Sequence, residues 1–240
     1  DVASCFVDMV FYSSVPDNNE LVKEAKGNFW NGIVIRRDEV ENYIGEADCV
    51  LIGPGMTRTA DTEQISDTLL QKYQHKKWVI DAGALQMMDP GLLNEQMIIT
   101  PHPRELAMVL AKATGRDVEE LVKDASEAPA RQLQEWSRQL GAATIVLKGK
   151  MDQVVTPEQS FEITGGNPGM TKGGTGDVLA GLIAALACTN ELLVAAVVGS
   201  VANKVAGEKL AENVGPFFNA SQLITAIPES LWSIYQAAAR

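Results

Sequence analysis

The first two thirds of the chain alternate short apolar, β-branched runs with longer stretches in which apolar residues recur at helical spacing. The short runs predict strands at residues 8–13, 32–35, 49–53, 78–81, 97–100 and 144–148. Amphipathic stretches such as residues 61–73 and 130–140 predict helices between most of these strands. This alternation predicts an α/β fold in three layers, with a central, mostly parallel sheet and helices on both of its faces.

The pattern changes after the last of these strands. Residues 153–155 and 160–164, separated by a turn with Pro157, predict a hairpin added at one sheet edge. The remaining pattern is helical, at residues 177–187, 192–210 and 221–226 and in an apolar segment around Trp232. No repeat, low-complexity tract or linker interrupts the chain, so we expect residues 1–240 to form a single domain.

Composition narrows the class of protein. Hydrophobic residues make up 46% and charged residues 21% of the chain, which is typical of a globular protein that folds by burying a core. The formal net charge is −11 and no cluster of five or more Lys and Arg occurs, so the sequence disfavours binding to a nucleic-acid backbone. An acidic protein that binds anionic nucleotides must concentrate positive potential locally, through backbone N–H groups and helix N-termini.

Cysteine usage and hydropathy indicate a cytoplasmic location without membrane contact. Cys5, Cys49 and Cys188 lie far apart in apolar segments, which predicts reduced, buried thiols. The longest apolar stretch, residues 179–187, is much shorter than the roughly 20 residues needed to span a bilayer. No signal-peptide pattern opens the chain.

The strongest motif is the glycine-rich segment GGNPGMTKGGTGD at residues 165–177, followed directly by the apolar run at residues 178–183. A glycine run that opens a helix directs several unpaired N–H groups and the positive end of the helix dipole at one spot. Such a spot binds phosphate. The segment matches neither the phosphate-binding P-loop pattern nor the dinucleotide-binding pattern G-x-G-x-x-G.

Asp177, at the end of this segment, has two interpretations. An Asp in a first helical turn usually stabilises the helix dipole by about 0.3–1 kcal/mol. However, a carboxylate beside an anion site repels the ligand that the glycines attract. That conflict is resolved if Asp177 is a general base, which takes a proton from a hydroxyl group as it attacks phosphorus.

A second motif, TPHPRE, covers residues 100–105 at the end of a predicted strand. A lone histidine in a loop is often structural or merely exposed. Here Pro101 and Pro103 fix the backbone around His102, so its ring could instead be held at the carboxyl edge of the sheet, where ligands of open α/β folds bind. Glu105 is either an N-terminal capping acid or a residue that organises a magnesium ion or its water shell.

Three further strand ends carry weaker signals. The turns at residues 52–56 and 80–84 end strands with small residues, which let a ligand or another backbone approach closely. Lys148 ends the last long strand, where its ammonium either reaches a nucleotide phosphate or is solvated.

Taken together, these segments resemble the ADP/ATP-dependent NAD(P)H-hydrate dehydratase family, a branch of the ribokinase-like superfamily. The resemblance spans about three quarters of the chain and rests on IGPG at residues 52–55, VIDA at 79–82, TPHP at 100–103, LKG at 147–149 and NPGMTKGGTGDVLAG at 167–181. It implies a ribokinase-like fold. It also implies a metabolite-repair reaction in which ADP or ATP, with Mg²⁺, phosphorylates the ring hydroxyl of hydrated NADH or NADPH, and phosphate then leaves to restore NADH or NADPH.

The resemblance also implies roles for individual residues. Asp177 would be the base and a substrate contact, and Gly55 and His102 would touch the hydrate. The anion hole would be formed by Gly173, Gly174, Thr175 and Gly176. The nucleotide would be bound by Lys148, Gly149, Lys150, Met151, Asp152 and Gly176. The chemistry needs positioning and anion stabilisation more than a nucleophilic side chain, and glycine N–H donors supply both.

The sequence departs from the family pattern at two places. The chain opens with Asp1, runs at once into a predicted strand and lacks the family's first strand and glycine turn, so we expect an incomplete N-terminus. Lys172 stands where many members carry a small or apolar residue, and it either contacts phosphate or is solvated. Asn167 in the same loop is a second candidate phosphate contact.

Two rival functions remain at this point. A phosphomethylpyrimidine or hydroxyethylthiazole kinase shares the glycine-rich anion hole, although such kinases tend to carry Asn in place of His102 and Cys in place of Asp177. A catalytically silent nucleotide-binding protein is the other alternative. The resemblance further implies a homo-oligomer and an NAD(P)H-hydrate epimerase as a partner, with no nucleic-acid or membrane partner.

Overall fold

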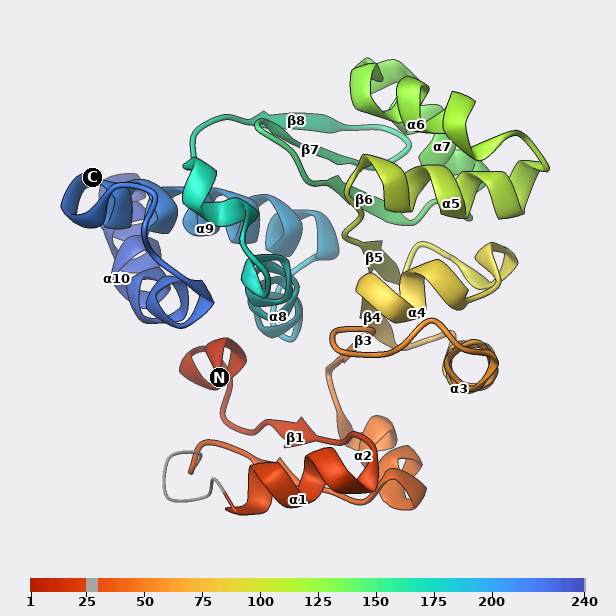
Figure 1. Cartoon of the computed structure of the whole chain (residues 1–240), viewed down its shortest axis with the longest axis horizontal. Coiled ribbons are helices and arrows are strands. Elements are labelled where there is room, and N and C mark those ends of the chain that lie inside the picture. Colours follow the sequence, from red (N-terminus) through yellow and green to blue (C-terminus); the bar gives the residue numbers. More distant parts are fainter. Residues whose placement is uncertain (25–29, 240) are drawn as a thin grey trace.

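The computed structural model describes residues 1–24 and 30–239, and a six-stranded sheet lies at its centre (Figure 1). In spatial order, which is also chain order, the strands are β3 (Cys49–Ile52), β4 (Lys77–Ile80), β5 (Met97–Ile99), β6 (Thr144–Leu147), β7 (Asp152–Val155) and β8 (Ser160–Ile163). Strands β3 to β6 are parallel, whereas β7 and β8 are antiparallel to their neighbours. The four predicted parallel strands and the predicted edge hairpin are therefore confirmed, each to within one residue at either end.

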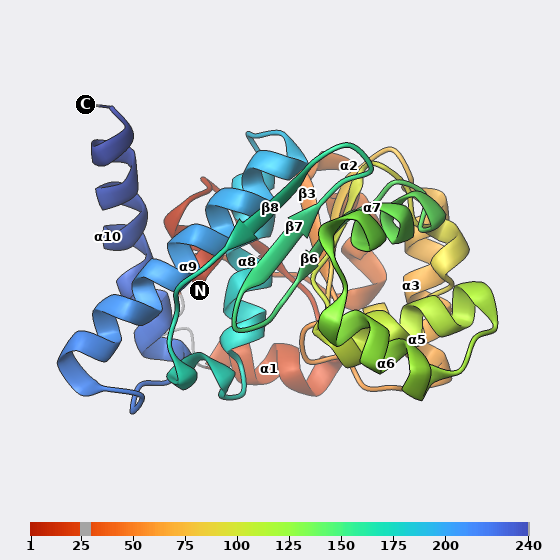
Figure 2. The same ribbon diagram turned by 90° about the horizontal axis from the view of Figure 1, so that it is seen from above.

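Helices cover both faces of this sheet (Figures 1 and 2). On one face lie α3 (Ala60–Lys72), α4 (Ala82–Met87), the short 3-10 helix η4 (Pro90–Leu92), α5 (Pro103–Thr114), α6 (Val118–Glu127) and α7 (Ala130–Gln139). On the other face lie α8 (Thr175–Ala187), which follows the 3-10 helix η5 (Pro168–Thr171), and α9 (Leu192–Val214). Helix α10 (Ala220–Ala238) packs against α9.

The alternation of side chains along each strand separates two apolar cores. Trp78 and Ile80 of β4 join the cluster formed with α3 to α7, whereas Val79 between them joins the cluster formed with α8 and α9. All three side chains are fully buried, and burial of each contributes about 1.5–3 kcal/mol. The predicted three-layer α/β/α architecture is confirmed.

The N-terminal part differs from the prediction. The chain opens with a 3-10 helix, η1 (Val2–Cys5), and not with a strand. The two predicted early strands shorten to β1 (Phe11–Tyr12) and β2 (Ile33–Val34), which pair in parallel with each other and not with the central sheet. The helices of this part are α1 (Pro16–Glu24), η3 (Arg37–Glu39) and α2 (Val40–Glu46).

The C-terminal prediction was wrong in one respect, because residues 220–238 form one helix and not two segments. Pro228 lies inside α10 and removes one backbone donor, at a typical cost of about 3 kcal/mol. Leu223 and Ile227, one turn apart, are fully buried in the cluster with α8, α9 and η1, and Asn219 and Gln222 form a capping box at the start of the helix. This burial keeps the helix continuous through the proline.

The cysteines are free, but they are not all buried. Cys5 is exposed in η1, so the predicted buried thiol is wrong there, while Cys49 and Cys188 are partly buried. Burial raises the pKa of the Cys49 and Cys188 thiols. Across residues 1–24 and 30–239, no helix is both long enough and apolar enough to span a bilayer.

Candidate active site

Several predicted site segments directly follow the carboxyl ends of the parallel strands β3, β4, β5 and β6. The sheet hydrogen bonds continue past the strands into the site: the Asp81 amide donates to the Ile52 carbonyl at 3.1 Å, and the Lys148 amide donates to the Pro101 carbonyl at 2.8 Å. Asp81 and Lys148 are thereby fixed by backbone pairing at the edge where open α/β folds bind ligands.

The turn after β3 requires glycine for packing. Gly53 has φ +118°, and a Cβ placed there would lie 1.7 Å from the Asp81 carbonyl oxygen. Two residues on, Gly55 also has a positive φ of +74°, but a Cβ there would meet nothing within 4 Å. Gly53 thus serves the close backbone approach predicted for this turn, and Gly55 leaves open space beside the strand ends.

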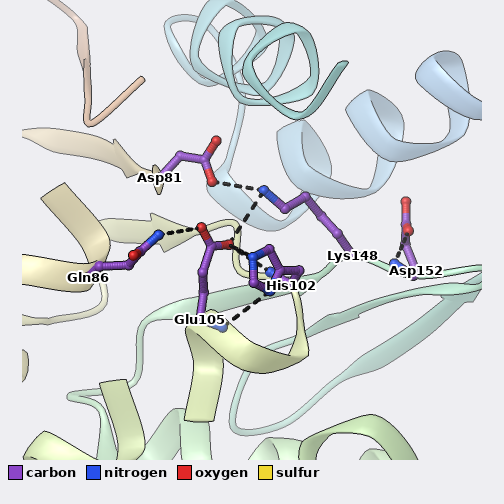
Figure 3. A network of polar contacts seen from close by, with 7 residues as sticks. Asp81, Gln86, His102, Glu105, Lys148 and Asp152 are labelled. Carbon is purple, nitrogen blue, oxygen red and sulfur yellow. Dashed lines mark hydrogen bonds and ion pairs between the residues drawn. The ribbon is translucent and has the colours of Figure 1, made fainter. Parts of the chain in front are cut away.

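A buried ion pair joins two strand ends (Figure 3). The Lys148 ammonium donates to Asp81 Oδ1 at 2.9 Å and lies 3.9 Å from Glu105 Oε2. The Asp81 side chain is 2% exposed and the Lys148 side chain 20% exposed, so the pair is largely desolvated. On its open side Lys148 approaches the start of α8, since a Cβ at Gly176 would lie 3.4 Å from Lys148 Nζ.

Glu105 is bound on both carboxylate oxygens. Its Oε1 accepts a hydrogen bond from Gln86 Nε2 at 2.9 Å, and its Oε2 accepts one from the His102 amide at 3.0 Å. In return His102 Nδ1 accepts from the Glu105 amide at 3.3 Å, which completes a capping box at the start of α5. The capping interpretation of Glu105 is confirmed, and an additional role toward magnesium stays a prediction. The His102 side chain remains half exposed at the strand edge.

The start of α8 presents free backbone donors. Gly174 adopts a left-handed conformation with φ +87° and gives the helix no side-chain cap. No residue that the structure describes accepts a hydrogen bond from the amides of Gly174, Gly176 or Asp177. Thr175 differs, because its hydroxyl donates to the Lys172 carbonyl at 2.7 Å and also to Met170, and thereby holds the loop together. These three amides, with the Lys148 ammonium close to Gly176, therefore form an electropositive, donor-rich end of the helix.

Asp177 lies exposed in the first turn of α8, close to the charges of the strand edge. Partial burial raises the pKa of its carboxyl group, the negative charges of Asp81 and Glu105 raise it further, and the Lys148 ammonium opposes them. A carboxylate that only stabilised the helix dipole would have a lowered pKa. The raised pKa makes the Asp177 carboxylate a stronger base than an ordinary exposed Asp.

The loop between β6 and β7 is exposed at Gly149, Lys150 and Met151 but anchored at its end. Asp152 is 5% exposed, and its Oδ1 accepts from the Gly149 amide at 2.9 Å and pairs with Lys204 Nζ of α9 at 3.2 Å. Burial raises the pKa of the Asp152 carboxyl group, and its two partners oppose that rise. The Asp152 side chain holds the loop, and a direct nucleotide contact of this residue stays a prediction.

The two candidate phosphate contacts, Asn167 and Lys172, are engaged elsewhere. The Asn167 side chain accepts from the Gly169 amide at 2.9 Å and caps η5. The Lys172 ammonium donates to the Pro216 carbonyl at 2.5 Å and to the Phe218 carbonyl at 2.6 Å, so this lysine is not simply solvated. Both side chains tie the glycine-rich loop in place, and a phosphate contact by either one stays a prediction.

Sequence reasoning missed three residues of this region: Asp81, Gln86 and Lys204. Asp81 carried a usable signal, because a charged residue that directly follows a fully apolar strand either is exposed or has a partner. Gln86 and Lys204 lie inside helices, where no local pattern marks them. Among the described residues, no group of three or more His, Cys, Asp and Glu side chains is placed to hold a metal ion.

Comparison with solved structures defines the class of protein. A ribokinase-like superfamily protein from Enterococcus faecalis has a similar fold, with a TM-score of 0.75 at 25% identity over 97% of this chain and 80% of that one. An ADP/ATP-dependent NAD(P)H-hydrate dehydratase from Bacillus subtilis, co-crystallised with ATP and Mg²⁺, aligns with a TM-score of 0.72 at 23% identity over 98% of this chain and 82% of that one. The fold is therefore ribokinase-like, as the resemblance implied.

Sequence comparison defines the family. The family model described as NAD(P)H-hydrate dehydratase matches residues 4–229, so this chain belongs to that family. A bifunctional NAD(P)H-hydrate repair enzyme from Methanocaldococcus jannaschii is 35% identical over 77% of this chain and 33% of its own length. An ADP-dependent (S)-NAD(P)H-hydrate dehydratase from Enterococcus faecalis is 32% identical over 71% of this chain and 57% of its own length. The chain thus spans one third to little more than half the length of these relatives.

Proposed function

We propose that this chain is a metabolite-repair enzyme that uses ADP or ATP to dehydrate hydrated NADH and NADPH. The observation that carries the proposal is the position of Asp177: its carboxylate lies at the start of α8 beside unpaired amides and beside the Lys148 ammonium. A phosphoryl group needs donors and positive charge, and its acceptor hydroxyl needs a base. These groups occur together at one sheet edge.

In the proposed reaction Asp177 accepts the proton of the ring hydroxyl while the hydroxyl oxygen attacks the terminal phosphorus of the nucleotide. The amides of Gly174, Gly176 and Asp177 and the Lys148 ammonium stabilise the negative charge on the transferring group. The lone pair of the ring nitrogen then expels phosphate, and a proton leaves the neighbouring ring carbon to restore the double bond.

The remaining predicted residues have positions that support binding roles. Gly55 leaves room beside the strand ends, and His102 holds a half-exposed ring there, so both are proposed to contact the hydrate. Gly149, Lys150 and Met151 form an exposed loop directly after Lys148 and are proposed to bind the nucleotide. Gly173, exposed just before the free amides, completes the proposed anion hole.

Magnesium is proposed to enter with the nucleotide as part of the substrate. Mg²⁺ usually keeps several waters and binds through one or two carboxylates together with substrate phosphates. Asp81 and Glu105 are the carboxylates nearest Lys148, but each already accepts hydrogen bonds from protein groups. Their proposed role is to hold Lys148 and His102 in place.

Several properties of the whole protein are also proposals. We propose one domain over residues 1–240, a cytoplasmic location and a homo-oligomer. An NAD(P)H-hydrate epimerase is proposed as a partner, and this is supported by relatives that are bifunctional NAD(P)H-hydrate repair enzymes. A hydroxyethylthiazole kinase from Pyrococcus horikoshii shares the fold at 17% identity, and the family match favours the dehydratase over that kinase.

The test is to incubate the protein with NADH hydrate, Mg²⁺ and ADP or ATP and to follow the recovery of NADH absorbance. We expect recovery that requires the nucleotide, with AMP or ADP and phosphate as the other products. Nucleotide-dependent phosphorylation of hydroxyethylthiazole or hydroxymethylpyrimidine without NADH recovery would favour the kinase. Nucleotide binding without turnover of any of these would favour the silent binding protein.

A further inference from the structure

Helix α9 places a buried ammonium group under the loop between β6 and β7. Lys204 is 5% exposed, and its Nζ lies 3.2 Å from each of three acceptors: the Gly149 carbonyl, the Lys150 carbonyl and Asp152 Oδ1. An ammonium group has three hydrogens, so these partners satisfy it completely. Lys204 therefore cannot bind a ligand without giving up a partner in the loop.

The buried ion pair between Lys204 and Asp152 contributes more to the geometry of the loop than to the stability of the fold. Replacing a buried ion pair by apolar residues is often neutral or stabilising, so the pair with Asp152 is weak grounds for a role in stability alone. The contacts of Lys204 and Asp152 do, however, fix the backbone of the loop. The Gly149 amide bonds to Asp152 at 2.9 Å, and Lys204 binds the carbonyls of the two residues between Lys148 and Met151, so the loop backbone is held at several points.

The same helix also reaches the loop that leads into α8. Glu208, one helical turn after Lys204, accepts a hydrogen bond from the Gly166 amide at 3.1 Å. A Cβ at Gly166 would lie 3.6 Å from Lys204 Nζ. Lys204 thus lies between the loop after β6 and the glycine-rich loop, the two segments that flank the free amides of α8.

We propose that Lys204 is a positioning residue, whose buried ammonium holds the backbone of Gly149, Lys150 and Asp152 in the conformation that binds the nucleotide. The proposal rests on the proposed nucleotide role of this loop. Lys204 contacts no substrate and acts only through the loop. Its effect should therefore fall on the nucleotide and not on the hydrate.

The test variant is Lys204→Met, which keeps most of the side-chain volume and removes the donor. We expect the KM for ADP, and its Kd measured by calorimetry, to rise roughly ten- to a hundredfold because the loop loses its preorganised conformation. The KM for NADPH hydrate should stay within about twofold, since the hydrate contacts lie on other strands. Amide hydrogen exchange of residues 149–152 should accelerate.

Two further variants separate positioning from folding. Lys209→Met is the matched control, because Lys209 lies on the same helix but contacts Ser233 and Glu229 of α10, and we expect unchanged values for both substrates. Asp152→Asn combined with Lys204→Met removes both buried charges while Asn can still accept from the Gly149 amide. This double variant should fold even if Lys204→Met alone does not, and it should still bind ADP weakly.

The outcomes distinguish this proposal from the proposed function. If the wild type binds ADP but does not restore NADH, the dehydratase proposal fails, and calorimetry still tests Lys204. If Lys204→Met or the double variant folds and binds ADP as the wild type does, or if the values for ADP and hydrate weaken in parallel, the positioning role is wrong. A wild type that binds no ADP overturns both.

Discussion

Two loops flank the proposed phosphoryl site, and they differ in how their polar groups are satisfied. In the loop after β6, two carbonyls and the Asp152 carboxylate all have partners, supplied by Lys204 and Gly149. At the start of α8, by contrast, three backbone amides have no acceptor among the described residues. The first N–H groups of a helix have no partner within the helix and can bind side chains, water or a ligand. The comparison therefore separates a loop whose backbone is held by the protein from a helix start whose donors are open to a ligand.

The largest effect is expected from Asp177→Asn, which removes the proposed base from the start of α8. We expect kcat to fall about 10²- to 10⁴-fold with little change in ADP affinity, because a general base contributes that much and the free amides remain. The measurement combines NADH recovery with calorimetry of ADP binding. The control is Asp61→Asn, an exposed acid in the first turn of α3, which should leave kcat unchanged. Equal losses of kcat in both variants would contradict the assignment.

Next in size is the loss of the pair between Lys148 and Asp81. We expect Lys148→Met to lower the free energy of unfolding by about 2–4 kcal/mol, because Asp81 is left buried without its cation. This is less than the usual cost of breaking a fully buried ion pair, since the Lys148 side chain is 20% exposed. Asp81→Asn in the same background should recover part of the loss. Chemical denaturation of the single and double variants measures the coupling. Additive losses would show that the two residues do not interact.

A smaller effect separates two glycines of one turn. Gly53→Ala should destabilise by roughly 2–4 kcal/mol, because the new Cβ would lie 1.7 Å from the Asp81 carbonyl oxygen at a strained φ. Gly55→Ala should cost only about 1–2 kcal/mol, since its φ is strained but the space is open. Thermal unfolding measures both. Equal destabilisation by both variants would mean that the close contact between Gly53 and the Asp81 carbonyl does not exclude a side chain at Gly53.

The smallest effect is the pH dependence that Asp177 contributes to stability. Its pKa is higher in the folded than in the unfolded chain, so the folded state binds the proton more tightly. This contribution therefore favours the folded state at low pH and is lost as pH rises through the folded pKa. Asp177→Asn should match the wild type in acid and be slightly more stable at neutral pH. A less stable variant at neutral pH would instead indicate a favourable dipole interaction.

The sequence predicted the central sheet well, because each parallel strand is a short apolar run between amphipathic stretches, and parallel pairing follows from that order. It predicted poorly where tertiary contacts override local signals. Two separate segments were predicted, at residues 221–226 and around Trp232, yet burial of Leu223 and Ile227 keeps α10 continuous through Pro228. The strands around Phe11 and Ile33 pair with each other and do not join the central sheet, which their local sequence does not indicate.

Local sequence patterns mark the loops of the candidate site but not the residues that support those loops. These patterns identify the glycine runs and the turn at His102, because these segments need special backbone conformations. Gln86 and Lys204 act through contacts with Glu105 and Asp152, which are distant in sequence. No local pattern encodes such pairs, so only the fold shows which carboxylates are bound.

The most direct test of the central claim is a crystal structure with ADP, Mg²⁺ and NADPH hydrate bound. We predict that terminal phosphoryl oxygens lie about 2.7–3.1 Å from the amides of Gly174, Gly176 or Asp177, with the ring hydroxyl on the Asp177 carboxylate. A phosphoryl group bound away from the start of α8, or a hydrate ring that does not reach Asp177, would contradict the account.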